Sequence, residues 1–232
     1  MSTASIKDYN IKIRSLKSTQ KITKTMKMVS ASKLRKAQQA QAHAKLYAQN
    51  VSALTSRISS AVQSTLHPLL TSRTDVKNIL ILAITSDKGL CGAFNHNVNK
   101  RVASWIEENR NHRKVEISCC GKRGYMFFKK YDIVKNYYKN VTENPKFSSA
   151  KEIGEDLSKS FVNAEYDEIY ISCNQFFNPL VQKTVFERIL PIDSFAILGE
   201  KAETTSQYLF DPEVKKLLGL LIPRYLYFKI YF

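Results

Sequence analysis

Acid, glycine and proline are scarce in the first third of this 232-residue sequence. No Asp or Glu stands between Asp8 and Asp75, Pro68 is the first proline, and Gly89 is the first glycine. A segment without breakers that is rich in Ala, Lys, Gln, Leu and Met predicts one very long helix, from Ser5 to Val62. Such a helix is about 85 Å long, which exceeds what a globular core needs, so we expect it to protrude.

Positive charge is concentrated in the same segment. The whole sequence carries a formal net charge of +16, from 36 Lys and Arg against 20 Asp and Glu. Residues 1–74 contain thirteen of those bases and one of those acids, so they contribute +12, and the remainder contributes +4. The excess therefore marks a local surface that faces acidic surroundings.

Two kinds of acidic partner are compatible with this helix. A basic coiled coil that binds nucleic acid by counterion release is one hypothesis. Against it, the cations are spread around the helix and few aromatic residues accompany them, so base stacking has no support. A ring of acidic protein surfaces around the helix explains the absence of acids better.

The sequence lacks the motifs of several kinds of functional site. The four Cys form no CxxC pair, the four His are scattered, and no apolar run is long enough to span a bilayer. Gly89-x-x-Gly92 and Gly121–Gly124 lack the Gly-Lys-Ser/Thr ending of a phosphate-binding loop. Ser86-Asp87 with a remote His could resemble a hydrolase triad, but the sequence has no GxSxG nucleophile elbow. We expect a non-catalytic chain in a reducing compartment, without metal or cofactor, and with the acidic pairs Glu155/Asp156 and Asp167/Glu168 on solvated surface.

A heptad-like stripe predicts that the long helix needs a partner. Apolar residues such as Ile6, Ile13 and Leu16 begin the stripe, polar residues fill its middle, and Val51, Ile58 and Val62 end it. A second stripe, Ile22, Met26 and Val29, occupies the polar middle. This seam resembles a coiled coil, so another element must cover it.

After Pro68 the pattern alternates between strands and helices. Apolar or alternating runs predict strands at Asn78–Ser86, Val115–Cys120, Ile133–Tyr138, Glu168–Cys173 and Val181–Leu190, the last as an edge hairpin partner. Helices are expected at Phe94–Asn111, before Lys130, at Ser149–Asn163 and over Leu217–Phe232, the last interrupted at Gly219 and Pro223. This order favours an α/β fold with a Rossmann-like domain and a mostly parallel sheet. The predicted domains are a long N-terminal helix (1–70), an α/β domain (75–208) and the start of a C-terminal helical segment (209–232).

Three segments resemble a known family. Lys21–Lys36 (KITKTMKMVSASKLRK) closely resembles the N-terminal signature of the gamma subunit of the rotary, proton-translocating ATP synthase. Ser86–Asn95 (SDKGLCGAFN) matches that family's second signature, and Tyr208–Pro212 (YLFDP) resembles a third segment. The matches run through the chain in order.

The resemblance implies a shaft rather than an enzyme. In this family two long helices form an antiparallel coiled coil inside a ring of alpha and beta subunits, and rotation driven by the membrane ring of c subunits forces the beta subunits to make ATP. By resemblance, Lys21, Lys24, Met26 and Lys27 meet the acidic loops of beta. Tyr208, Phe210 and Asp211 match foot residues near the c ring and an epsilon-type subunit. The implied partners are therefore subunits of the complex and not nucleic acid.

The resemblance also implies two further expectations. The family continues beyond the residues that match Pro223–Phe232 into a second long helix, so we expect the C-terminal partner helix to be missing from this apparently truncated sequence. Met1 stands directly before the helix, with no transit segment apparent. That favours a peripheral position on the cytoplasmic side of a bacterial inner membrane, with the matrix side of the mitochondrial inner membrane as the second choice.

Overall fold

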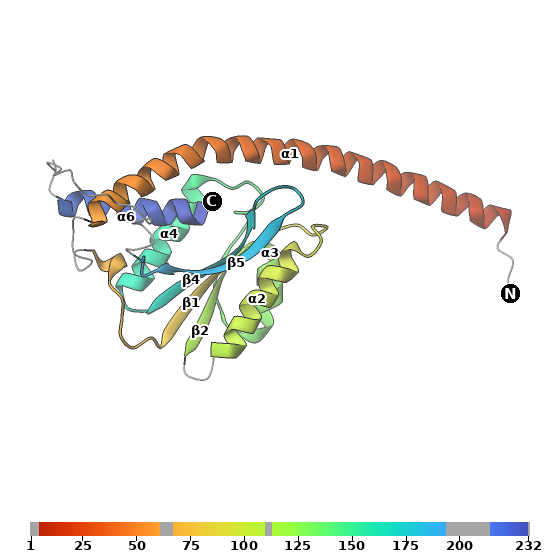
Figure 1. The fold of residues 1–232 in the computed structure, drawn as a ribbon. Helices are drawn as coiled ribbons and strands as arrows, with labels where there is room; N and C mark the ends of the chain where they lie inside the picture. Colours follow the sequence, from red (N-terminus) through yellow and green to blue (C-terminus); the bar gives the residue numbers. More distant parts are fainter. Residues whose placement is uncertain (1–4, 61–66, 110–112, 194–213, 232) are drawn as a thin grey trace. The chain divides into compact units, whose positions relative to one another are not determined.

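The long amino-terminal helix is present. α1 spans Ile6–Ser60, a run of 55 residues, in a computed structural model that describes residues 5–60, 67–109, 113–193 and 214–231 (Figure 1). The backbone N–H of Ser5 donates to Asp8 Oδ2 at 3.0 Å, and the Ser5 hydroxyl accepts from the Lys7 N–H at 3.4 Å. A serine followed three residues later by an acid forms a capping box. The single acid of residues 1–74 therefore fixes the start of the helix.

The chain divides into two compact units. One is Met1–Tyr47 and the other is Ala48–Phe232. The described part of the first unit is the amino-terminal stretch of α1, and the second unit holds the sheet and the remaining helices. The domain ranges predicted from the sequence (1–70, 75–208 and 209–232) follow pattern changes along the chain and stay a prediction.

A five-stranded sheet lies at the centre of the second unit, in the order β3-β2-β1-β4-β5. Its strands are β1 (Asn78–Ile84), β2 (Lys114–Cys120), β3 (Val134–Tyr138), β4 (Glu168–Phe176) and β5 (Gln182–Leu190). The first four run parallel, and β5 pairs antiparallel with β4. The mostly parallel α/β sheet with an edge hairpin is thus confirmed.

Helices cover both faces of this sheet (Figure 1). α2 (Phe94–Asn109) and α3 (Lys122–Phe128) pack on one face, and α4 (Phe147–Val162) and α6 (Val214–Tyr231) pack on the other. Successive residues of the central strand β1 alternate between these two cores: Ile79 and Ile81 face the first, and Leu80 and Leu82 face the second. An apolar strand buried on both sides is what a doubly covered parallel sheet requires.

The expected interruption of the last helix is wrong. α6 continues through both Gly219 and Pro223. Proline lacks an N–H and its ring crowds the carbonyl four residues earlier, at a cost of about 3 kcal/mol. That carbonyl belongs to Gly219. The burial of Leu218, Ile222, Leu226 and Ile230, all at most 7% exposed, keeps the segment helical against that cost.

α6 is fastened to α4 by close packing at a glycine. A Cβ placed on Gly154 of α4 would lie 2.3 Å from Cδ1 of Tyr227 and 3.4 Å from Cδ1 of Ile230. The Tyr227 ring therefore occupies the space that any other residue at position 154 would fill. Beside it, the Phe147 ring packs on Phe228 at 4.7 Å between centroids. Gly154 thus sets how closely the two helices approach.

We predict that Gly154→Val lowers the free energy of unfolding of the α/β unit by about 1–3 kcal/mol, because it overpacks the α4–α6 contact. Gly219→Ala is the matched control, since it also replaces a helical glycine but meets no neighbour within 4 Å, and it should stabilise by up to about 1 kcal/mol. Urea unfolding followed by the fluorescence of Trp105, the single tryptophan, measures both. Equal effects of the two variants would contradict the packing argument.

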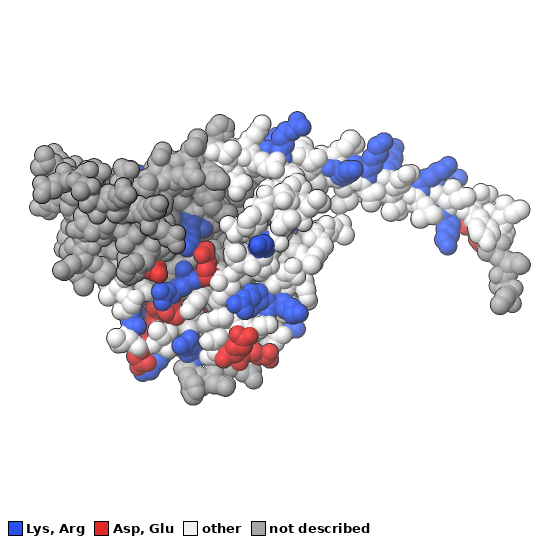
Figure 2. All heavy atoms as spheres, in the orientation of Figure 1, with Lys and Arg blue, Asp and Glu red and all other residues white. Residues whose placement is uncertain are grey.

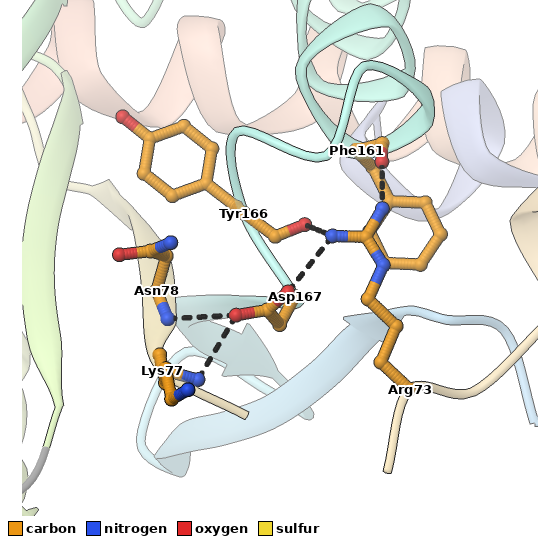
Figure 3. Close-up of polar contacts among 6 residues, drawn as sticks. All are labelled: Arg73, Lys77, Asn78, Phe161, Tyr166 and Asp167. Atoms are coloured by element: carbon orange, nitrogen blue, oxygen red, sulfur yellow. Dashed lines mark hydrogen bonds and ion pairs between the residues drawn. The ribbon is translucent and has the colours of Figure 1, made fainter. Parts of the chain in front are cut away.

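Asp167 lies in a polar network at the amino edge of the sheet (Figure 3). Its Oδ1 pairs with Nη1 of Arg73 at 2.8 Å, and its Oδ2 accepts the backbone N–H groups of Lys77 and Asn78 at 2.9 and 2.8 Å. Arg73 also donates to the carbonyls of Tyr166 and Phe161. The network ties the segment before β1 to the end of α4 and the start of β4. Solvated surface is therefore the wrong description of Asp167, whose side chain is 12% exposed.

The same contacts shift the ionisation of this carboxyl. Burial by itself opposes the charged form, but the hydrogen bonds from Asn78, Arg73 and Lys77 and the charge of Arg73 outweigh it and hold the pKa of Asp167 below its ordinary value of 3.8. A carboxyl whose pKa is lower in the folded state stabilises the fold above its unfolded-state pKa. That contribution is lost as the pH falls through the lower, folded-state pKa.

We predict that Asp167→Ala lowers the free energy of unfolding by about 3 kcal/mol at pH 7, since it removes the ion-pair partner of Arg73 and the acceptor of the Lys77 and Asn78 N–H groups. The wild type should also lose more stability than the variant as the pH falls below about 4. Trp105 fluorescence in urea, from pH 7 to pH 2.5, measures both quantities. Glu155→Gln is the control, because Glu155 makes only a half-exposed pair with Lys151 at 3.7 Å. A loss no larger than that of the control would refute this role of the network.

Candidate subunit-contact surface

The four predicted contact residues of the first signature all lie on α1 and are exposed to solvent. At about 100° per residue, Lys21, Lys24 and Lys27 share an arc of about 120° around the helix. Met26 lies about 100° or more from each of them. The structure therefore brings the three lysines onto one side and places Met26 on another.

Met26 belongs to a short apolar stripe. Ile22, Met26 and Val29 follow the i, i+4, i+7 spacing of one helix face and are 57%, 45% and 52% exposed. The earlier apolar residues Tyr9, Ile13 and Leu16 lie on the lysine side of the helix. Ile11, which is 60% exposed, lies on the side of Met26, so exposed apolar residues occur on both sides of α1 before the first signature. Figure 2 shows the Lys and Arg side chains recurring along this helix, with Asp only near its start.

Threonine hydroxyls in this region are bonded to their own helix. Thr19 donates to the Ser15 carbonyl at 3.1 Å, Thr23 to that of Thr19 at 3.0 Å, and Thr25 to that of Lys21 at 3.0 Å. Such bonds to the preceding turn satisfy the hydroxyl proton without any outside acceptor. Sequence reasoning missed this, although Thr at intervals of two and four residues in a breaker-free helix was the available signal. The hydroxyl groups of these three threonines are thus satisfied within α1.

The three predicted foot residues Tyr208, Phe210 and Asp211 lie outside the described residues. The structure does not test their role or that of the lysines and Met26, so all seven remain a prediction.

The second signature forms a tightly hydrogen-bonded loop after β1. The Ser86 N–H donates to Asn95 Oδ1 at 2.8 Å, and Asn95 Nδ2 donates to Ser86 Oγ at 2.9 Å and to Cys91 Sγ at 3.0 Å. Asp87 accepts the Lys122 N–H at 2.9 Å and the Thr142 hydroxyl at 2.8 Å. The side chains considered for hydrolase chemistry therefore hold this loop to the start of α3 and to the segment after β3.

The second glycine motif has a packing role. Gly121 has φ of +94°, and a Cβ there would lie 2.1 Å from the carbonyl oxygen of Thr85. The Thr85 hydroxyl in turn accepts the Gly124 N–H at 2.8 Å. Gly121, before α3, and Gly124, in its first turn, let this segment pack against Thr85, directly after β1, which explains both glycines without a bound phosphate.

Two other classes of site are absent from the residues that the structure describes. No group of three or more His, Cys, Asp or Glu is arranged there to hold a metal ion. None of the described helices combines the length and hydropathy needed to cross a bilayer.

Comparisons with known sequences identify the family. The ATP synthase family model matches residues 5–232. The ATP synthase gamma chain of Chlorobium phaeobacteroides is 37% identical over 228 residues, covering 96% of this chain and 77% of that relative. The gamma chain of Chloroherpeton thalassium is 35% identical over 237 residues, covering 96% and 78%.

Solved structures share the fold. The rotor of the Euglena gracilis mitochondrial ATP synthase matches with a TM-score of 0.57 at 20% identity, over 97% of this chain and 81% of that one. The central stalk and c ring of the Tetrahymena thermophila mitochondrial enzyme match with a TM-score of 0.53 at 22% identity, over 80% and 89%. With the family model covering nearly the whole sequence, the chain belongs to the ATP synthase gamma chain family.

Proposed function

We propose that this chain is the central-stalk rotor subunit of a proton-translocating ATP synthase. It couples rotation of the membrane ring to ATP synthesis in the alpha/beta hexamer and is itself non-catalytic, since the catalytic sites lie on the beta subunits. Besides family membership, one observation carries the proposal. The helix α1 runs for 55 residues without a break, and its one acid, Asp8, lies in the first turn. The comparisons give no support to the nucleic-acid alternative.

A rotor needs a stiff rod. Each residue of α1 after the first turn adds a backbone hydrogen bond to the turn before it, and no Gly or Pro interrupts this series. The capping box at Ser5 and Asp8 prevents fraying at the start. These features support the transmission of torque along α1.

A rotor also needs contacts that form weakly and repeatedly. Lysines on flexible stems attract acidic loops at long range without fixed geometry. The internal bonds of Thr19, Thr23 and Thr25 remove donors that would otherwise bond to a passing neighbour. The surface around the first signature can therefore be attracted to an acidic ring without locking onto it.

The proposed partners follow from this role. Lys21, Lys24, Met26 and Lys27 meet the beta subunits inside the ring of alpha and beta subunits. Tyr208, Phe210 and Asp211 meet the c ring and an epsilon-type subunit. The chain is thereby held peripherally at a membrane through the complex, and we propose the cytoplasmic side of a bacterial inner membrane.

Co-purification tests the proposal. A tag on this chain should recover alpha, beta and epsilon-type subunits and the c ring, with ATPase activity that persists after nuclease treatment. Recovery of nucleic acid that is released by salt, without ATPase activity, would overturn the proposal in favour of the alternative.

We predict that Met26→Lys uncouples ATP hydrolysis from proton pumping. The new charge stands on the apolar stripe, where it must be desolvated each time a neighbour slides past. In complexes reconstituted into vesicles, ATP-driven acidification should fall by about tenfold or more relative to ATP hydrolysis.

Met28→Lys is the matched control for this prediction. Met28 is also exposed, but it lies on the lysine side of α1, where one more cation joins an existing arc. It should leave the coupling ratio nearly unchanged. A Met26→Lys complex that pumps as well as the Met28→Lys complex would refute the distinction between the two faces.

A further inference from the structure

The helix α3 and the 3₁₀ helix η3 (Lys129–Tyr131) that follows it have a basic and partly apolar outer side. No acid stands between Gly121 and Asp132 in the sequence. Gly124 and Phe128 are buried on the inner side of α3. On the outer side, Met126 is 48% exposed and Tyr131 is 52% exposed. These two large side chains therefore reach solvent next to lysines and an arginine.

One lysine of this segment lies over two aromatic rings. Lys130 Nζ is 5.3 Å from the centroid of the half-buried Phe127 ring and 4.8 Å from that of the Tyr131 ring. The two ring centroids are 6.2 Å apart. A ring face attracts an ammonium group, so the lysine and the two rings form one cluster. We name the surface formed by Met126, Phe127, Lys130 and Tyr131 the α3 face.

Further cations lie at both ends of the α3 face. Lys122 and Arg123 begin α3, and Lys129 follows its last residue, about 10 Å away along the helix axis. Neither these three nor Lys130 has an ion pair with any residue that the structure describes. One exposed acid, Asp132, follows the segment. The α3 face is therefore an apolar centre between two cationic ends.

The inner side of α3 holds this face firmly on the sheet. The Tyr125 ring stacks on that of Tyr137 of β3, with 4.3 Å between centroids and 3° between planes. The Gly124 N–H donates to the Thr85 hydroxyl at 2.8 Å, and Phe128 packs in the core beneath. A backbone fixed in this way reduces the entropy that is lost when the outer side chains are bound.

We propose that the α3 face rests on the headgroup region of an anionic phospholipid bilayer. Met126 and Tyr131 reach below the headgroups, and the four cations face the lipid phosphates. Aromatic and apolar side chains flanked by Lys and Arg on flexible stems are typical of surfaces that bind a membrane interface. The negative surface potential of such a bilayer complements the unpaired cations. Nucleic acid fits less well, because Met126 at the centre of the face cannot stack on a base.

A lipid surface also suits a part that turns. Lipids are fluid and present the same headgroups at every angle of rotation, whereas a stationary protein bound to this face would hold the rotor back. The inference rests on the proposed function, because assembly with the membrane ring is what brings the chain close to a bilayer. Direct contact with lipid goes beyond attachment through the other subunits, and it would steady the α/β unit during rotation.

Fluorescence quenching by lipid tests the proposal in the complete complex. A fluorescent amino acid is introduced at position 126 or, as a control, at position 162, where Val162 is 52% exposed at the end of α4. Each complex is reconstituted into vesicles of phosphatidylethanolamine and phosphatidylglycerol whose acyl chains carry bromine. Quenching at position 126 should exceed that at position 162 about twofold or more, and should largely disappear in brominated phosphatidylcholine, which has no net charge.

The outcomes separate this proposal from the proposed function. Equal quenching at the two positions would overturn the lipid contact, and ATP-driven acidification of the same vesicles would leave the proposed function standing. Shielding of position 126 from dissolved iodide without quenching by lipid would also overturn it, in favour of a protein neighbour or, where nuclease removes the shielding, of nucleic acid. A chain that recovers no ATPase subunits would defeat both proposals.

A charge substitution tests the role of the cations. Lys130→Gln removes the ammonium group over the two rings and should reduce quenching at position 126 by about half. Lys151→Gln is the matched control, because Lys151 is an exposed lysine of α4 that pairs with Glu155 at 3.7 Å, and it should leave the quenching unchanged. Both positions are exposed, so both variants should stay folded. Equal quenching in the two variants would contradict a role of Lys130 in lipid binding.

Discussion

The ladder of backbone hydrogen bonds in α1 is the constraint on which the rest of this account depends. It can run for 55 residues only because the sequence offers no Gly or Pro to break it. The acid that the segment does contain, Asp8, is used to close the first turn. A helix so long cannot bury its own surface, and its side chains must therefore be compatible with both solvent and neighbours.

In the second unit, the helix α6 is packed firmly on the α/β domain. Its core places α6 against α4, with the Tyr227 ring over Gly154. Arg73 and Asp167 fasten the segment that precedes β1 to the same side of the sheet. In a rotor, these two fastenings would let the domain turn together with α6.

Helices and strands that depend on many neighbouring residues could be predicted from the sequence. Features that depend on contacts between distant segments could not. The run without breakers predicted α1, and the apolar run at Asn78 predicted a central strand, because each depends on many residues. The continuous helix through Pro223 could not be read, since it depends on four side chains meeting a core built by distant segments. Asp167 was misjudged for the same reason: its partner Arg73 lies 94 residues away. The positive φ of Leu90 could not be predicted either, because leucine rarely adopts this backbone conformation.

The central claim is that this chain turns inside a ring of catalytic subunits, and direct observation of rotation tests it most sharply. The alpha/beta hexamer is fixed to a surface, and a visible particle is attached to a cysteine introduced at Met126, an exposed position on α3. The account predicts one-directional rotation on addition of ATP, with three equal pauses per turn. ATP hydrolysis at a normal rate with a stationary particle firmly bound to the chain would contradict it.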